Sequence, residues 1–282
     1  MGKSDSISAF FSTLATSAKS LVKVAVQSRR PTISRVAADR ERLIVMGNGP
    51  SLKRNIDEDM ELLMGSRTMA VNFAANADEF FSLKPDYYII ADPHFFDGRS
   101  SDPNVARLFD RLNGMVDWDM TLFIPAVRKA SDTGIKNQHI KIEKFNLVGV
   151  EGFRFMENMV YGSGRGMPRP RNVLIPAIMV GMAMGYKEIF IIGADHTWTR
   201  TLEVDDDNNV VSVQPHFYKD NEEEKQRVTS VYRNVRLHDM LLSMHLAFKS
   251  YHTIARYARE RGVRIVNATP GSFIDAFQRE KL

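Results

Sequence analysis

Hydrophobic residues near the start of the chain recur at helical spacing. Apolar side chains fall at i, i+3, i+4 and i+7, with serine, threonine and lysine on the other face; the apolar positions are Ile7, Phe10, Phe11, Leu14, Ala18, Leu21, Val22 and Ala25. This pattern predicts an amphipathic helix. Its apolar runs are shorter than the roughly 20 residues that span a bilayer, and Ser and Thr interrupt any signal-peptide core. Two alternatives remain, namely a helix on an anionic membrane surface and a helix packed on its own domain or on a second subunit.

From residue 43 the pattern changes to short, β-branched apolar runs separated by stretches long enough for helices. The predicted strands are residues 43–46, 68–73, 87–91, 121–124, 188–192 and 263–267. Residues 173–184 are predicted to form an apolar helix that feeds the strand at 188–192, and residues 222–261 a long helical stretch before the last strand. The alternation predicts an α/β fold with an open, mostly parallel, doubly wound sheet. In such Rossmann-like sheets ligands bind beyond the carboxyl ends of the strands.

The positive charge of the chain is concentrated in its first segment. Residues 1–42 hold eight basic and three acidic side chains, which leaves 30 basic and 31 acidic groups in the remaining 240 residues. We therefore expect a basic N-terminal arm at 1–41, a single α/β domain at 42–282, and no nucleic-acid surface on that domain. The chain has no Cys, which excludes disulfides, thiolate metal sites and cysteine nucleophiles and favours a cytoplasmic location.

The first strand runs into a glycine-rich turn at residues 47–52, Gly-Asn-Gly-Pro-Ser-Leu. Gly47 and Gly49 would let a ligand approach the backbone, and Asn48 and Ser51 offer short polar side chains before a helix N-terminus. This arrangement suits the phosphate or ribose of a nucleotide. The turn is neither the dinucleotide fingerprint, because Leu52 stands in place of the third glycine, nor a P-loop. A plain strand-to-helix turn is the alternative.

Polar residues follow three further strands in the same way. Asn72 ends the second strand, Asp92 follows the third, and Gly193, Ala194 and Asp195 follow the strand at 188–192. Any one of these could be a cap or a turn residue. Four strand ends with polar chemistry at one sheet edge nevertheless favour a ligand site.

Two stretches, residues 47–52 and 184–195, resemble the signature sequences of bacterial sialyltransferases of glycosyltransferase family 42. They are also similar to the wider superfamily of 6-hydroxymethylpterin pyrophosphokinase MptE-like proteins, which includes flagellin glycosyltransferases. The similarity runs from about residue 42 to 276 and is thin between the two stretches. It implies a GT-A-like fold and a transferase whose donor is a CMP-linked acidic sugar. The chemistry of the transfer, taken by itself, requires no metal, and we expect no cofactor. The implied acceptor is a cell-surface glycan or glycolipid, as in lipopolysaccharide or capsule biosynthesis.

The resemblance also implies roles for particular residues. Asn48, Ser51 and Asn72 would hold the CMP-sugar, and residues 262–272 match the last strand and its nucleotide-side turn. Counted back from that turn without gaps, the histidine of the family falls on His245. The chain departs from the family at two places. Before the central helix, Arg171, Asn172 and Val173 replace Thr-Ser-Gly, and Asn172 is the nucleotide-binding candidate there. After the Gly-x-Asp strand, Thr197 and Trp198 stand where the family has a tyrosine.

The transfer itself needs a base for the acceptor hydroxyl, groups that stabilise the departing phosphate, and a pocket for the sugar carboxylate. His245 is the candidate base, and an exposed helix histidine is the alternative; the reserves are His216, His94 and His252. Tyr218, in a predicted lid at about 197–225, could replace the missing tyrosine, and residues 205–209 are expected to form a hairpin tip. The Gly/Pro-rich loop at 162–171 supplies Arg165, Arg169 and Arg171 for a phosphate or carboxylate, or is a solvated surface loop.

Two other classes of function remain open. An MptE-like pyrophosphokinase would bind ATP and magnesium with Asp92 and Asp195 as metal-facing carboxylates. A non-catalytic nucleotide-binding module is the third possibility. The partners expected under the preferred function are the nucleotide-sugar donor, the glycan acceptor, an anionic membrane surface bound through residues 1–30 at the inner face of the membrane, and a second copy of the chain.

Overall fold

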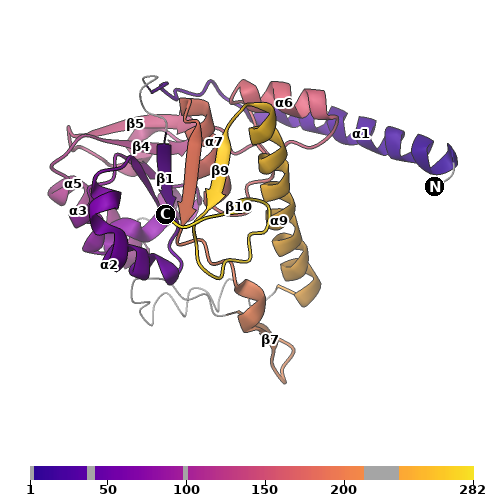
Figure 1. Cartoon of the computed structure of the whole chain (residues 1–282). Coiled ribbons are helices and arrows are strands. Elements are labelled where there is room, and N and C mark those ends of the chain that lie inside the picture. Colours follow the sequence, from indigo (N-terminus) through magenta and orange to yellow (C-terminus); the bar gives the residue numbers. More distant parts are fainter. Residues whose placement is uncertain (1–2, 37–41, 98–100, 213–234) are drawn as a thin grey trace.

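In the computed structural model, the residues described are 3–36, 42–97, 101–212 and 235–282. Within them, eight parallel strands form one sheet in the order β10-β9-β6-β1-β2-β3-β4-β5 (Figure 1). The strands are β1 (Arg42–Met46), β2 (Thr68–Val71), β3 (Tyr87–Ile89), β4 (Met120–Pro125), β5 (Ile140–Phe145), β6 (Glu188–Ile192), β9 (Arg264–Asn267) and β10 (Gln278–Arg279). The predicted α/β fold with an open parallel sheet is confirmed.

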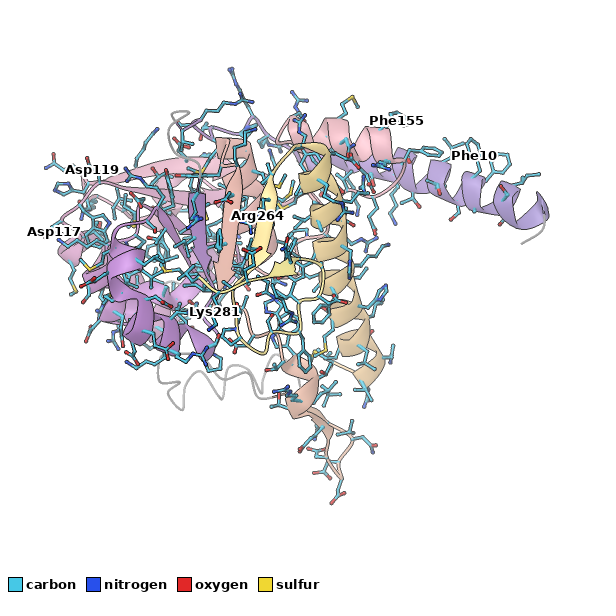
Figure 2. The ribbon with its side chains drawn as sticks, in the orientation of Figure 1. Phe10, Asp117, Asp119, Phe155, Arg264 and Lys281 are labelled. Carbon is cyan, nitrogen blue, oxygen red and sulfur yellow. The ribbon has the colours of Figure 1, made fainter. Side chains whose placement is uncertain are left out.

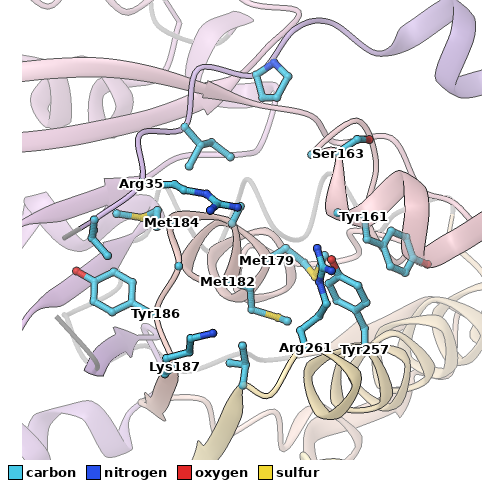
Figure 3. Close-up of a pocket in the computed structure, with 18 of the residues that line it drawn as sticks. Arg35, Tyr161, Ser163, Met179, Met182, Met184, Tyr186, Lys187, Tyr257 and Arg261 are labelled. Carbon is cyan, nitrogen blue, oxygen red and sulfur yellow. The ribbon is translucent and has the colours of Figure 1, made fainter. Parts of the chain in front are cut away.

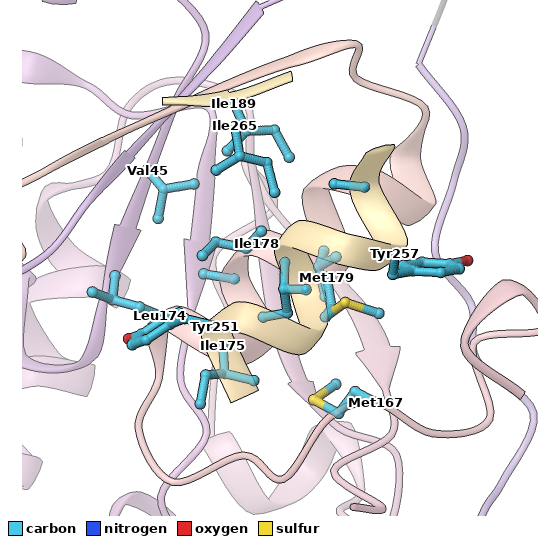
Figure 4. Packing of buried hydrophobic residues seen from close by; sticks show 14 of the residues in the cluster. Val45, Met167, Leu174, Ile175, Ile178, Met179, Ile189, Tyr251, Tyr257 and Ile265 are labelled. Carbon is cyan, nitrogen blue, oxygen red and sulfur yellow. The ribbon is translucent and has the colours of Figure 1, made fainter. Parts of the chain in front are cut away.

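Helices cover both faces of this sheet. The helices of the described residues are α1 (Lys3–Gln27), which extends outward from the body, α2 (Ser51–Met64), α3 (Glu79–Leu83), α4 (His94–Asp97), α5 (Pro103–Met115), α6 (Arg154–Gly162), α7 (Leu174–Met184) and α9 (Leu237–Glu260). Alternate residues of each central strand enter two separate cores, since side chains along a strand point to opposite faces. Leu43 and Val45 pack with α7 and α9 in one core, whereas Ile44 and Met46 pack with α2 and α5 in the other. Figure 4 shows the first core, where α7 and Tyr251 of α9 lie against the strands.

The order of the strands places a topological switch point between β1 and β6. The chain builds β1 to β5 outward in one direction and then returns to place β6 on the other side of β1, followed by β9 and β10. In open α/β sheets the crevice that binds ligands lies at such a point, outside the carboxyl ends of the strands, and here these are the ends of β1 and β6. The strand ends singled out in the sequence follow β6, β1, β2 and β3, which are consecutive in the sheet.

Two strands of the eight-stranded sheet were not predicted. β5 reads Ile-Lys-Ile-Glu-Lys-Phe, in which three charged residues interrupt the apolar run that marks a buried parallel strand. β10 is only two polar residues, Gln278 and Arg279, which pair with Val266 and Asn267. Such a short edge strand has no hydrophobic pattern of its own, because only its backbone takes part in the sheet.

The first helix docks on the domain through serine. Ser20 Oγ donates to the carbonyl oxygen of Glu151 at 2.7 Å, and Ser17 Oγ accepts from the backbone N–H of Phe153 at 2.9 Å. A Cβ on Gly152 would lie 2.2 Å from Ser17 Oγ, so glycine is required for this close contact. The predicted amphipathic helix is confirmed, but the apolar stripe from Ile7 to Val22 stays largely exposed.

The first part of the predicted lid forms an antiparallel hairpin. β7 (Leu202–Val204) pairs with β8 (Val210–Ser212). The carboxylate of Asp205 accepts backbone N–H groups from Asp207 and Asn209 at 3.1 and 2.7 Å, and this closes the turn. The predicted hairpin tip at 205–209 is confirmed. His216 and Tyr218 lie outside the described residues.

Candidate active site

Two glycine turns interlock at the switch point. The Gly47 N–H donates to the carbonyl oxygen of Ile192, and the Gly49 N–H donates to that of Gly193, both at 2.8 Å. A Cβ on Gly47 would lie 2.4 Å from the oxygen of Gly193, and a Cβ on Gly49 would lie 2.7 Å from the same atom. The sequence interpretation assigned this space to a ligand. The turn after β6 fills it instead, so these glycines allow two backbones to approach each other.

The N-terminus of α2 already has an anionic partner. Oδ2 of Asp195 accepts a hydrogen bond from Ser51 Oγ at 2.8 Å and lies 3.4 Å from the Ser51 backbone nitrogen. A carboxylate here accepts from the first N–H of the helix and faces the positive end of the helix dipole. The turn was expected to receive a phosphate. As the protein stands, Asp195 occupies that position.

The turn after β9 completes this part of the edge. The Ala194 N–H donates to Oγ1 of Thr269 at 3.1 Å, and Ser272 Oγ donates to the carbonyl oxygen of Ala194 at 2.7 Å. Gly193 has a left-handed φ of 63°, which glycine adopts at no steric cost. Residues 269–272 therefore lie at the same sheet edge as residues 193–195.

Buried amide groups lie next along the edge, after β1 and β2. Asn48 Nδ2 donates to the carbonyl oxygen of Val71 at 3.1 Å, which fixes the orientation of the Asn48 amide. Oδ1 of Asn48 and Oδ1 of Asn72 are buried and have no hydrogen-bond partner among the described residues. Asn72 also has a left-handed φ of 47°. Unpaired buried acceptors cost free energy, and a ligand that donates to them recovers it.

Hydrogen bonds among three side chains, Asn172, Tyr251 and His196, connect the start of α7 to the turn after β6. Asn172 Oδ1 accepts from the Leu174 N–H at 3.1 Å, which caps α7, and from the hydroxyl of Tyr251 at 2.9 Å. The Tyr251 hydroxyl lies 2.7 Å from His196 Nε2. The other amide atom, Asn172 Nδ2, is buried without a partner in the described part of the chain. These hydrogen bonds connect α7, α9 and the turn after β6.

His196 was not among the predicted site residues, although it directly follows Asp195. Its ring centroid lies 4.1 Å from that of Trp198, and the ring also contacts Phe248 and Tyr251. Burial lowers the pKa of His196 to about 3, and burial raises the pKa of Tyr251 well above its ordinary value. Both groups are therefore neutral at pH 7. The signal in the sequence is the position of His196 directly after Asp195, at the end of a predicted strand.

Asp92 lies farther along the same edge, after β3. It is exposed, and its Oδ1 accepts from the His94 N–H at 2.8 Å, while His94 Nε2 lies 2.6 Å from Oδ2 of Asp102. β1 and β2 separate β3 from β6, and three strand spacings of about 4.8 Å set the ends of β3 and β6 about 14 Å apart. Asp92 and Asp195 are therefore poorly placed to share one magnesium ion. Within the described residues, no three His, Asp or Glu side chains are grouped as a metal site.

The three arginines of the loop at 162–171 differ in their surroundings. Arg169 is engaged in an ion pair with Glu151, which Lys249 also contacts at 2.8 Å. The Arg169 carbonyl oxygen accepts from Ser250 Oγ at 3.0 Å. Arg169 thus joins the loop to α9, whereas Arg165 and Arg171 are exposed. Arg171 immediately precedes Asn172, which places it closer in sequence to the edge.

The candidate histidines of α9 lie on its outer side. His245 is exposed, whereas the neighbouring Met244 and Ala247 are buried against the domain. His252 is exposed and contacts Asp275 Oδ1 at 3.1 Å. The structure does not bring His245 into the hydrogen-bonded chain of Asn172, Tyr251 and His196. Its role as a base stays a prediction.

A cavity of about 710 Å³ lies at the opposite, amino edge of the sheet (Figure 3). The ends of α7 and α9, α6, and the segment that follows α1 line this cavity, with Arg35, Lys187 and Arg261 among its residues. None of the predicted site residues lies in it. The cavity is thus separate from the crevice at the carboxyl ends of the strands.

The comparisons with known proteins bear on the fold. No family model and no curated protein sequence matches the chain. Among solved structures, the chain is similar to the MAf glycosyltransferase from Magnetospirillum magneticum AMB-1, with a TM-score of 0.52 and 10% sequence identity. The match covers 96% of this chain and 38% of that one. The chain therefore has the fold of part of a much longer glycosyltransferase.

Proposed function

We propose that the protein is a glycosyltransferase that binds a nucleotide-activated sugar at the carboxyl ends of β1, β2 and β6. The observation that carries this proposal is the pair of buried acceptors, Oδ1 of Asn48 and Oδ1 of Asn72, at the switch point of the sheet. Ribose hydroxyls and the amino group of cytosine are donors that such acceptors recognise. The fold shared with a glycosyltransferase supports the same class of reaction.

The resemblance to family 42 refines the proposal to a CMP-linked acidic sugar transferred without a metal to a cell-surface glycan or glycolipid. Asp195 holds the α2 N-terminus, so the donor phosphate would instead meet cationic or hydroxyl groups nearer α7. Arg171 is exposed beside Asn172 and is free to take that role or to hold the sugar carboxylate. The reaction would take place in the cytoplasm, at the inner face of the membrane.

Two histidines are candidates for the base that accepts the proton of the acceptor hydroxyl. The family resemblance indicates His245, and the geometry of the crevice indicates His196, which Tyr251 orients. A base works best when its pKa lies near the working pH, and burial holds the pKa of His196 far below that range. An anionic donor bound nearby would raise this pKa, because a neighbouring negative charge favours the imidazolium form.

The test is release of the nucleotide from sugar donors. The protein is incubated with CMP-linked and UDP-linked sugars, with EDTA or with magnesium, and free nucleotide is measured. The proposal expects CMP release in EDTA, with slower release by Asn72→Gly, which keeps the left-handed backbone but removes the amide. In a parallel reaction with ATP, magnesium and 6-hydroxymethylpterin, formation of AMP with transfer of the pyrophosphoryl group to the pterin hydroxyl, without CMP release from the sugar donors, would instead identify a pyrophosphokinase. Binding of CMP with no turnover of any donor would identify a non-catalytic module.

A further inference from the structure

The first helix presents an apolar surface that the domain does not cover. α1 contacts the domain through Ser17 and Ser20, through the partly buried Val24 and, at one border of the apolar stripe, through the ring of Phe10. The side chain of Phe11 is 60% exposed, and six more apolar side chains of α1 are also largely exposed: Ile7, Phe10, Leu14, Leu21, Val22 and Val26. Figure 1 shows α1 extending outward from the body of the protein beside α6.

Side chains of α6 and the turn before it enlarge this surface. The ring of Phe10 packs 5.5 Å from that of Phe153, which stacks on Phe155 at 6.0 Å. Phe155 is 73% exposed, and Met159, one turn later, is exposed as well. Figure 2 shows Phe10 and Phe155 on neighbouring elements. We call this surface, formed by the exposed apolar residues of α1 with Phe155 and Met159, the α1–α6 patch.

The charged side chains of residues 6–36, which supply the α1 part of the patch, are all positive. Residues 6–36 contain five cationic side chains and no carboxylate: Lys19, Lys23, Arg29, Arg30 and Arg35. Lys19 and Lys23 lie one turn apart on a helix face beside the stripe. Exposed Phe and Leu residues flanked by Lys and Arg are the arrangement by which interfacial helices bind anionic lipid.

We propose that the α1–α6 patch binds the surface of an anionic lipid bilayer. The exposed aromatic and aliphatic side chains would enter the boundary between headgroups and acyl chains, and Lys19 and Lys23 would contact the phosphates. A second copy of the chain is a poorer occupant, because symmetric pairing of two α1 helices would bring their cations together with no carboxylate between residues 6 and 36 to offset them. This surface is distinct from the crevice, so the proposal does not depend on the reaction catalysed.

The test is sedimentation of the full chain with vesicles of phosphatidylcholine alone or with 30% phosphatidylglycerol. We expect binding to the anionic vesicles and little to the neutral ones. Phe11→Glu should abolish binding, whereas Ser12→Glu, which adds the same charge at the adjacent exposed position on another face, should retain most of it. Lys19→Gln with Lys23→Gln should weaken binding by about 25-fold, at roughly fivefold for each charge near the surface.

Three results would overturn the proposal. One is a wild-type protein that does not sediment with anionic vesicles. Another is an equal loss of vesicle binding in Phe11→Glu and Ser12→Glu, because the added negative charge alone would then account for the loss. The third is a dimer in light scattering that Phe11→Glu converts to a monomer, which would assign the patch to a second copy. Circular dichroism of each variant would establish that α1 and the domain remain folded.

Discussion

The hydroxyl of Ser51 donates a hydrogen bond of 2.8 Å to Oδ2 of Asp195, although 144 positions separate the two residues. The bond joins the turn after β1 to the turn after β6 and supplies α2 with an anionic cap. The same two turns are held by backbone bonds from Gly47 and Gly49. Motifs that look like phosphate-binding elements therefore stabilise each other, and the proposed recognition of a ligand rests on the neighbouring asparagines, Asn48 and Asn72.

This interlocking predicts a large loss of stability in Gly47→Ala. The new Cβ would lie 2.4 Å from a backbone oxygen of Gly193, and relief of the clash would have to separate two central strands. We expect a loss of about 3 kcal/mol in the free energy of unfolding, measured by urea denaturation. Gly114→Ala is the matched control, because nothing lies within 4 Å of the added carbon. This control should be neutral or more stable by about 0.5–1 kcal/mol. Similar stabilities of the two variants would show that the turns are not interlocked.

Burial of His196 predicts a dependence of stability on pH. The pKa of this histidine is lowered to about 3 in the folded protein, whereas the unfolded value is about 6.5. The unfolded state binds more protons between these values, so stability falls as the pH falls below about 6.5. The wild type should lose about 1 kcal/mol more than His196→Asn between pH 6.5 and 5.5. The exposed His245→Asn should keep the wild-type profile, and a flat profile for the wild type would contradict the prediction.

Loss of the Asn72 amide predicts weaker nucleotide binding with an unchanged fold. Asn72→Gly should lower the affinity for the bound nucleotide by about two- to tenfold, the value of one hydrogen bond of about 0.5–1.5 kcal/mol. Asn208→Gly is the control, because Asn208 also has a left-handed φ, 62°, but lies at the hairpin tip. The measurement is isothermal titration calorimetry of both variants. Equal affinities in the two variants would exclude Asn72 from the site.

Turnover distinguishes the two candidate bases. If His245 is the base, His245→Ala should lower turnover by roughly two to four orders of magnitude with little change in donor affinity. If His196 takes this role, His196→Asn should show that loss and His245→Ala should be near normal. His252→Ala, on the same exposed side of α9, is the control. Normal turnover in both candidate variants would exclude both residues.

The sequence predicted the sheet and its main helices well because buried strands have unbroken apolar runs and α7 is apolar on all sides. It predicted that Asn48, Asn72 and Asp195 share one edge because parallel strands end at the same edge. It could not show that Asp195 accepts a hydrogen bond from Ser51, 144 positions away. A carboxylate that follows a strand is equally consistent with a ligand-binding group. The hydrogen bonds that connect His196 to Asn172 pass through Tyr251, a buried residue of α9. No local sequence pattern indicates such a long-range contact.

Calorimetric titration of CMP, UMP and ATP, in EDTA and in magnesium, measures whether a nucleotide binds at the carboxyl ends of β1 and β2. We predict that CMP binds in EDTA, more tightly than UMP or ATP, and that Asn72→Gly weakens this binding whereas Asn208→Gly does not. Binding of ATP only in the presence of magnesium, unaffected by Asn72→Gly, would contradict this prediction.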